Sequence, residues 1–396
     1  MKLPRPQDRL ALLERRRNEK MARSAHAYVR GNTVQFYQWL NSQRGRSLPH
    51  GPSVWICGDC HVGNLGPTGD IRGHIDINIR DLDQAVIGNP THDLVRLALS
   101  LAMAARGSDL PGVTTARMLE EMMRGYEQAF VKGQGEQPER PKQVKGSMRT
   151  AVQRTWKHLA RERIDNERPT IPLGKSFWPL SRAEKAEIKL LCATPEMHRL
   201  VTSLRGRPND ARVELLDSAY WVKGCSSLGL MRYAVLLGVG DDDQQDHCLI
   251  DVKEAVAAAA PRASRAHMPR DNARRVVEGA RHLSPALGDR MLATRFLDHG
   301  VFIRELLPQD MKLQMDTLNE TDAMRAAGYL ARIVGNAHAR QMDDDMRKSW
   351  LADLQLNRSK TLDAPSWLWT SVVQLVGSHE EGYLEHCRRY ALETAR

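Results

Sequence analysis

Polar side chains that could hold a metal ion follow two short apolar segments near the start of the chain. Asp59 comes just after residues 54–56, which have the character of a buried strand, and Asp81 follows residues 75–79, in which isoleucine alternates with polar residues. Alternation with a period of two predicts a half-buried strand. Because both carboxylates come at strand ends, we expect them to share a divalent cation through oxygen ligands.

The spacing of Asp59 and Asn64 indicates a more specific chemistry. Asn64 lies five positions after Asp59, which is the spacing of the base and the magnesium-binding asparagine in a protein-kinase catalytic loop. In this interpretation Asp59 accepts or orients the proton of a substrate hydroxyl, and Asn64 and Asp81 hold magnesium on the phosphates. Asp83 is a further candidate metal ligand. The alternative is a pair of polar turns that only cap strands.

A second set of candidates begins after residue 219, where the sequence predicts a strand, a tight turn and a second strand. Gly224, Ser226 and Gly229 occupy the places of the Gly-x-Gly-x-x-Gly loop that covers ATP phosphates in kinases, with serine as the middle residue. Lys253 lies on the third predicted strand, where a kinase places the lysine that binds the phosphates. We therefore predict that this loop and this lysine bind ATP.

The phosphate-binding lysine of a kinase pairs with a glutamate on the following helix. Residues 272–283 predict such a helix, and Glu278 is the best candidate on it. Glu254 is adjacent to Lys253 but should point to the opposite face of the strand. The alternative for Lys253 is an ordinary residue of an alternating edge strand.

Several motifs resemble an uncharacterised bacterial family, domain of unknown function 2252. They are Gly-Asp-x-His-x-x-Asn at 58–64, Asp-Leu-Asp-Gln-Ala at 81–85, Gly-x-Pro-x-x-Asp-Leu-x-Arg-Leu at 88–97 and Ala-His-Ala-Arg at 337–340. That family is grouped with protein-kinase-like folds, and the same pattern is similar to aminoglycoside and choline phosphotransferases. The resemblance implies that Asp93 braces the catalytic loop and that ATP and Mg²⁺ are the cofactors.

The resemblance also implies an α+β, two-lobed protein-kinase-like fold whose parts occur in an unusual order. The catalytic-loop residues come first and the glycine loop and Lys253 come later, so we expect a circular permutant. Its predicted parts are a catalytic-loop part of the helical lobe (1–131), a linker and helical insertion (132–210), a β-rich nucleotide-binding lobe (211–308) and a helical part that completes the catalytic lobe (309–396). This order predicts that Lys253 packs across a cleft from Asp81. It also predicts that the helix ending near Arg340 lies beside the strand leading to Asp59.

The composition limits the classes of protein to consider. Of the 396 residues 41% are hydrophobic, enough for one large or two ordinary domains, and no apolar run is long enough for a membrane span. Six cysteines are scattered without a disulfide framework, so we expect a reduced, cytoplasmic protein. The net charge of +10 comes from basic residues spread along the chain. This spread favours a basic enzyme that binds nucleoside triphosphate over a nucleic-acid-binding protein.

The sequence therefore predicts an ATP- and Mg²⁺-dependent phosphotransferase that acts on a small-molecule hydroxyl acceptor. One alternative is a kinase-fold nucleotidyltransferase. Another is a metal-dependent hydrolase built on Asp59, His61 and Asp81, to which His74, Asp76 and His92 could add ligands for a second metal. The hydrolase alternative leaves the glycine loop and Lys253 unexplained.

Overall fold

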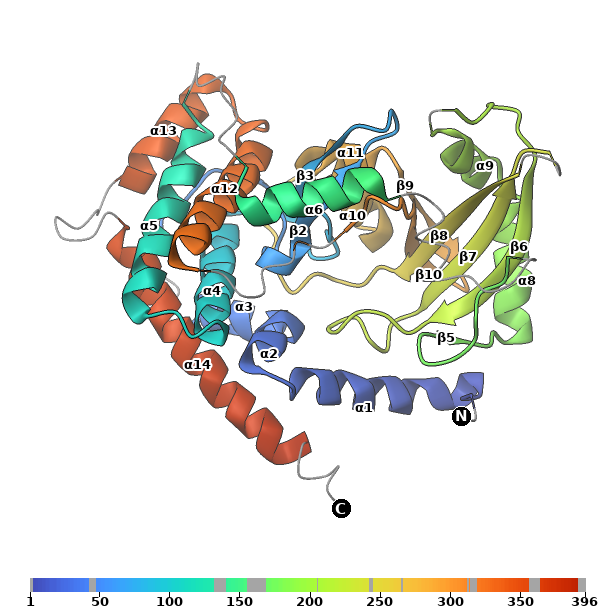
Figure 1. Ribbon diagram of the computed structural model, residues 1–396, viewed down its shortest axis with the longest axis horizontal. Helices are drawn as coiled ribbons and strands as arrows, with labels where there is room; N and C mark the ends of the chain where they lie inside the picture. The colour runs from blue at the N-terminus through green and yellow to red at the C-terminus, as the bar shows by residue number, and fades with distance from the viewer. Residues whose placement is uncertain are drawn as a thin grey trace.

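The computed structural model has the mixed α and β composition that the sequence predicts, and the α+β class is confirmed. The residues that it describes are 3–42, 48–131, 140–154, 169–204, 206–241, 245–264, 266–311, 313, 319–355 and 364–390. Figure 1 shows a group of helices on one side of the molecule and an antiparallel sheet on the other. We call these the helical region and the sheet region.

The sheet region contains six antiparallel strands in the order β5-β6-β7-β8-β10-β9. The strands are β5 (Phe177–Trp178), β6 (Val213–Trp221), β7 (Arg232–Val239), β8 (Asp246–Glu254), β9 (Met291–Phe296) and β10 (His299–Glu305). The connection from β6 to β7 contains the predicted glycine loop. Lys253 is the second-last residue of β8 and pairs with Phe302 of β10 in register.

Two helices, α8 (Arg182–Cys192) and α9 (Pro195–Thr202), cover one face of this sheet and share a buried apolar cluster with it. The sequence predicts a single helix over 182–205, and the structure divides it. The Thr194 side chain caps a new helix by accepting a hydrogen bond from a backbone N–H, and Pro195 cannot continue the preceding one. Residues 132–139 and 155–168 of the predicted insertion lie outside the described residues.

On the opposite face, α10 (Asn272–Leu283) follows β8 in the sequence and packs against β9 and β10. Its bounds are those that the sequence predicts. The short helix α11 (Pro285–Gly288) follows it. At Gly279 a Cβ atom would meet Ala85 and the ring of Trp55. The absence of a side chain at this position therefore lets α10 approach the segment that carries Asp81 and Asp83.

The helical region is built around two helices that pack closely. Its members are α4 (Thr91–Gly107), α5 (Gly112–Gln128), α12 (Glu320–Ala339), α13 (Asp344–Gln355) and α14 (Ser366–Tyr390). A Cβ atom at Gly125 of α5 would meet the carbonyl oxygen of Gly328 of α12, and one at Gly335 would meet Tyr126 and Ala129. Small residues at these crossings let the two backbones come together, and a buried apolar core surrounds them.

Further helices accompany these regions, and the longest of them contacts both. They are η1 (Pro6–Asp8), α1 (Arg9–Met21), α2 (Ala25–Gly31), α3 (Thr33–Asn41) and α6 (Lys142–Gln153). In Figure 1, α1 runs below the space between the regions, with its start near α8. Arg9 Nη1 lies 2.6 Å from Glu184 Oε1 of α8 in a buried ion pair. This contact anchors α1 to the sheet region.

Two small antiparallel strand pairs lie where the regions meet. They are β1 (Val54–Ile56) with β4 (Val86–Gly88), and β2 (Leu65–Gly69) with β3 (Ile75–Ile79); the short helix η3 (Val62–Asn64) lies between β1 and β2. The predicted strands at 54–56 and 75–79 are thereby confirmed. Just after α12, Gln341 exchanges two hydrogen bonds with the backbone of Trp55, of 2.8 and 3.0 Å. The end of this helix therefore lies beside the strand leading to Asp59, as predicted.

Candidate active site

The loop after β1 is held in place by one buried carboxylate. Asp93 of α4 accepts hydrogen bonds from the backbone N–H groups of Cys57 (2.7 Å) and Gly58 (2.9 Å). His338 Nε2 of α12 lies 3.1 Å from the same carboxylate, and both side chains are fully buried. Gly58 has φ +73°, and a Cβ there would meet the Gln84 carbonyl oxygen. Asp93 thus braces the loop, the role that the resemblance implies.

Asp59 leaves this loop with its carboxylate fixed by a buried arginine. Arg96 Nε donates to Asp59 Oδ1 at 2.8 Å, and Arg96 Nη2 donates to the Val29 carbonyl oxygen at 2.7 Å. The other carboxylate oxygen, Oδ2, lies 3.9 Å from His61 Nε2. Burial lowers the pKa of His61 to about 3, so this imidazole is neutral at physiological pH. Among the described residues, no charged group therefore donates a hydrogen bond to Asp59 Oδ2.

Arg96 was not among the residues predicted for the site. The signal was nonetheless present, because Arg96 follows Asp93 by three positions on a helix. Residues three apart lie on the same face of a helix. One turn of α4 therefore braces the loop backbone and orients the Asp59 carboxylate together.

Asn64 is also oriented by the loop itself. Its Nδ2 donates to the Asp59 carbonyl oxygen at 2.9 Å, and the residue is buried. Because the amide nitrogen is used in this way, the amide oxygen remains as the acceptor for an outside partner. Asn64, Asp59 and Asp81 all line one cleft of about 510 Å³. The predicted catalytic and metal-binding residues are thus brought together.

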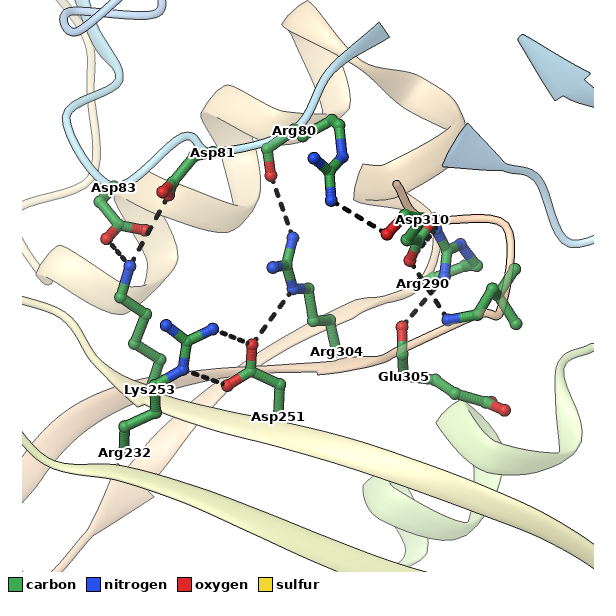
Figure 2. Close-up of polar contacts among 11 residues, drawn as sticks. Arg80, Asp81, Asp83, Arg232, Asp251, Lys253, Arg290, Arg304, Glu305 and Asp310 are labelled. Carbon is green, nitrogen blue, oxygen red and sulfur yellow. Dashed lines mark hydrogen bonds and ion pairs between the residues drawn. The ribbon is translucent and has the colours of Figure 1, made fainter. Parts of the chain in front are cut away.

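Lys253 reaches from the sheet to Asp81 and Asp83, and Asp81 lines this cleft (Figure 2). Its Nζ lies 3.7 Å from Asp81 Oδ1 and forms a closer ion pair with Asp83 Oδ2. The contact between Lys253 and Asp81 that the permuted order predicts is therefore present. The Lys253 side chain is 5% exposed, whereas that of Asp81 is 50% exposed, so the lysine is held in place and the Asp81 carboxylate remains accessible.

The two aspartates differ in acidity because they share one lysine. Although Asp81 is half exposed, desolvation by the surrounding protein works against ionisation of its carboxylate, but Lys253 outweighs this effect and holds the pKa of Asp81 well below its usual range. Burial and the neighbouring Asp81 carboxylate raise the pKa of Asp83 to about 6. Asp81 is therefore the more persistent anion of the pair.

The structure corrects the prediction for Glu278. Its carboxylate pairs with Arg281 and His282 on its own helix, each at 3.4 Å, and its side chain is 39% exposed. Among the described residues, the carboxylates in ion-pair contact with Lys253 are those of Asp81 and Asp83. The face of α10 turned to the site instead presents Arg275, whose Nη2 donates to the Asp83 carbonyl oxygen at 2.9 Å. Glu278 was predicted to pair with Lys253, and Asp83 was predicted to bind metal. In the structure, Asp83 is the residue that pairs closely with Lys253.

The glycine loop covers the cleft only in part. Gly224 and Ser226 line it, and Ser226 also lines a smaller cavity of about 100 Å³ beside Asp83. Gly224 has φ +105°, a conformation that favours glycine. Gly229 (φ +109°) lines neither cavity and lies against Leu10 of α1. Its position supports a role in shaping the turn and not the predicted contact with a cofactor.

A charged cluster on the inner face of the sheet was not predicted (Figure 2). Arg232 Nε donates to Asp251 Oδ1 at 2.8 Å, and Arg304 Nε lies 3.5 Å from Asp251 Oδ2. Arg304 Nη1 also donates to the Arg80 carbonyl oxygen at 3.0 Å, just before Asp81. Burial opposes ionisation, but Arg232 and Arg304 hold the pKa of Asp251 well below its usual range. The cluster ties three strands to the loop that carries Asp81.

Asp59, His61 and Asp81 of the alternative hydrolase site line the same cleft, but the residues expected to add ligands for a second metal lie elsewhere. His74 is 77% exposed and pairs with Asp70 at 3.2 Å, while Asp76 pairs with Arg140 at 3.3 Å. Within the described ranges, no three or more His, Cys, Asp or Glu side chains are grouped as a metal site. Magnesium bound together with phosphates needs only one or two protein carboxylates, because the phosphates supply further oxygens. The oxygens of Asn64 and Asp81 fit that requirement.

Comparison with known proteins assigns the chain to a family. It belongs to the family described as "Uncharacterized protein conserved in bacteria" (DUF2252), which matches residues 9–389. No curated protein and no solved structure matches the chain. None of the helices in the described part of the chain has the length and apolar character needed to cross a membrane.

Proposed function

We propose that the protein is a Mg²⁺- and ATP-dependent phosphotransferase that acts on a hydroxyl group of a small molecule. The observation that carries the proposal is the contact of Lys253 of β8 with Asp81, a residue that lines one cleft together with Asp59 and Asn64. A lysine from the sheet, a metal-binding aspartate and a base-and-asparagine loop are the parts that a kinase brings together.

The order of elements supports a kinase-like fold with permuted parts. Along residues 213–305 a glycine-containing turn is followed by the lysine strand, then by α10, and then by the hairpin of β9 and β10. The glycine loop, the lysine strand and the helix follow one another in the same order in kinases. The loop with Asp59 and Asn64 precedes this segment here, and the bonds between Gln341 and Trp55 join the chain's later helices to it. We therefore interpret the chain as two lobes in circularly permuted order.

Each residue of the site has a distinct task in this proposal. The free Oδ2 of Asp59 accepts or orients the proton of the acceptor hydroxyl, while Arg96 keeps the carboxylate in position. The Asn64 amide oxygen and the Asp81 carboxylate hold Mg²⁺, which neutralises phosphate charge when bound. Lys253 exchanges its contact with Asp83 for a phosphate oxygen.

Thermal unfolding with and without magnesium-ATP tests this proposal. A ligand that binds only the folded state raises the melting temperature. At a concentration of one hundred times its Kd, it adds about 3 kcal/mol to the free energy of unfolding. We expect a rise of about 3 °C or more for the wild type and none for Asp81→Asn, which loses the metal ligand. Glu278→Gln is the matched control, because it removes the same charge from an exposed site on α10, and it should behave as the wild type.

Two results would contradict the proposal: no rise at millimolar magnesium-ATP, or an equal rise in Asp81→Asn. Product analysis then separates the two transfer reactions. Phosphoryl transfer releases ADP, whereas transfer of the nucleotide releases pyrophosphate. Release of pyrophosphate together with an adenylated product would replace the phosphotransferase by a nucleotidyltransferase at the same site.

A further inference from the structure

We infer that the acceptor is an anionic molecule, a polyol or similar compound that carries at least one phosphate group besides its reacting hydroxyl. This inference rests on the proposed function, because it names the substrate that shares the cleft with ATP. It follows from the charge on one wall of the cleft, formed by Lys20 at the end of α1, Arg23 between the helices and Arg30 of α2. We call these three residues the basic wall.

The lining of the cleft carries a large excess of positive charge. Seven of the lining side chains are lysine or arginine, and two are aspartate. Both aspartates are already engaged, Asp59 by Arg96 and Asp81 by Lys253. Asp251 compensates Arg232 and Arg304. The positive charge of the basic wall therefore has no carboxylate among the described residues to neutralise it.

The individual contacts of the basic wall agree with this count. Among the described residues, Lys20, Arg23 and Arg30 form no ion pair with a carboxylate. Lys20 Nζ donates to the Gly224 carbonyl oxygen at 3.0 Å, which turns this ammonium group to the glycine loop. The Nε atom of Arg30 is buried and has no hydrogen-bond partner among the described residues. A buried donor without a partner costs free energy that a bound anion would recover.

The position of Arg30 assigns the anion to the acceptor and not to the nucleotide. Its guanidinium lies against Gly63, on the loop between Asp59 and Asn64, and next to His61. This is the side of the base, where the hydroxyl must lie to lose its proton. The nucleotide phosphates belong to the other side, with Lys253 and Asp81. An anionic group held by Arg30 therefore lies on the molecule whose hydroxyl faces Asp59.

The same charge disfavours the cationic acceptors of similar phosphotransferases. Aminoglycosides and choline are cations, and like charges in a partly desolvated cleft repel each other. Arginine suits a phosphate group because its planar guanidinium can donate two parallel hydrogen bonds. Two arginines and a lysine on one wall therefore fit a phosphorylated molecule.

Calorimetric titration without divalent metal tests the basic wall separately from the nucleotide site. The probe is myo-inositol hexakisphosphate, a phosphorylated polyol, and myo-inositol is its uncharged counterpart. We expect the wild type to bind the phosphorylated probe and not the uncharged one. The double variant Arg23→Gln/Arg30→Gln should bind the probe at least about tenfold more weakly.

Two controls make the test specific. Arg15→Gln/Arg199→Gln removes the same charge from two exposed arginines that lie outside the cleft lining, and it should bind within about twofold of the wild type. Arg23→Gln alone keeps the test valid if the double variant does not fold, because Arg23 is exposed. Magnesium-ATP affinity of the double variant should stay within about threefold of the wild type.

The outcomes separate this inference from the proposed function. Unchanged binding of the probe by the double variant would overturn the inference, and so would an equal loss of probe and magnesium-ATP binding, which would assign the basic wall to the nucleotide. A wild type that binds the probe through these arginines but never binds magnesium-ATP would overturn the phosphotransferase and support the anion site.

Discussion

Two charged networks hold the candidate site, and they are built in different ways. The first fixes the loop after β1, where Asp93 binds two backbone N–H groups and Arg96 binds Asp59. The second lies on the inner face of the sheet, where Asp251 binds Arg232 and Arg304. The first network positions backbone, whereas the second joins side chains of three strands.

The rigidity of the two sides of the cleft has different origins. In the first network, one turn of α4 supplies both partners, so the geometry of a single helix sets the distances. In the second, sheet register sets them, because Arg304 pairs with Asp251 across β10 and β8, and Arg232 lies diagonally across β7 and β8. The loop side therefore depends on one element and the sheet side on strand pairing. Each network can be disturbed without changing the other.

The largest expected effect comes from the first network, through Asp93→Asn. This change removes the charge that binds two N–H groups and contacts His338, all in a fully buried place. Breaking a buried, paired charge costs about 3 kcal/mol or more of unfolding free energy. Urea denaturation measures it. Asp109→Asn, an exposed loop position, is the matched control and should change stability by less than about 0.5 kcal/mol. A small loss in Asp93→Asn would show that the loop is held by other contacts.

A smaller effect is expected from the second network, through Asp251→Asn, which leaves two guanidinium groups without their carboxylate. We expect a loss of about 2 kcal/mol at neutral pH, since Arg304 keeps its bond to the Arg80 carbonyl oxygen. The pKa of Asp251 is lowered in the folded state. Its contribution is therefore fully present above the unfolded pKa of about 4, and it is lost as the pH falls below that value.

The stability contributed by Asp251 should therefore depend on pH. The stability difference between the wild type and Asp251→Asn should be constant from neutral pH down to about pH 5, and it should shrink at lower pH. Asp210→Asn, in an exposed turn, should show no such dependence. A difference that grows on acidification would contradict the lowered pKa and the salt-bridge account of the cluster.

The contrast between the networks also explains what could be predicted from the sequence. Asp59, Asn64 and Asp81 lie within a short span whose strands and turns have clear patterns, so their meeting in one cleft was predictable. The contact of Lys253 with Asp81 was predictable only through the resemblance, since nothing local links residues so far apart. Arg232, Asp251 and Arg304 meet through the register of three strands, which composition and periodicity do not fix. Glu278 lies on the predicted helix, but its carboxylate pairs with Arg281 and His282 of the same helix, and helix bounds alone do not predict such pairing.

The smallest expected effect concerns the junction of the two networks, where Lys253 binds Asp83. Asp83 competes with phosphate for this lysine, because the ion pair must open before Lys253 can reach a phosphate oxygen. Asp83→Asn weakens the competitor while keeping its shape. We therefore expect magnesium-ATP to bind a few-fold more tightly to this variant, about 1 kcal/mol, at neutral pH. Asp81→Asn, two residues away, should have the opposite effect.

The pKa of Asp83, raised to about 6, adds a second expectation, since protonation weakens the same competitor. The affinity advantage of Asp83→Asn over the wild type should therefore diminish as the pH falls below 6. Titration of both proteins with magnesium-ATP at pH 7.5 and at pH 5.5 measures this, and weaker binding by Asp83→Asn at neutral pH would instead make Asp83 a metal ligand.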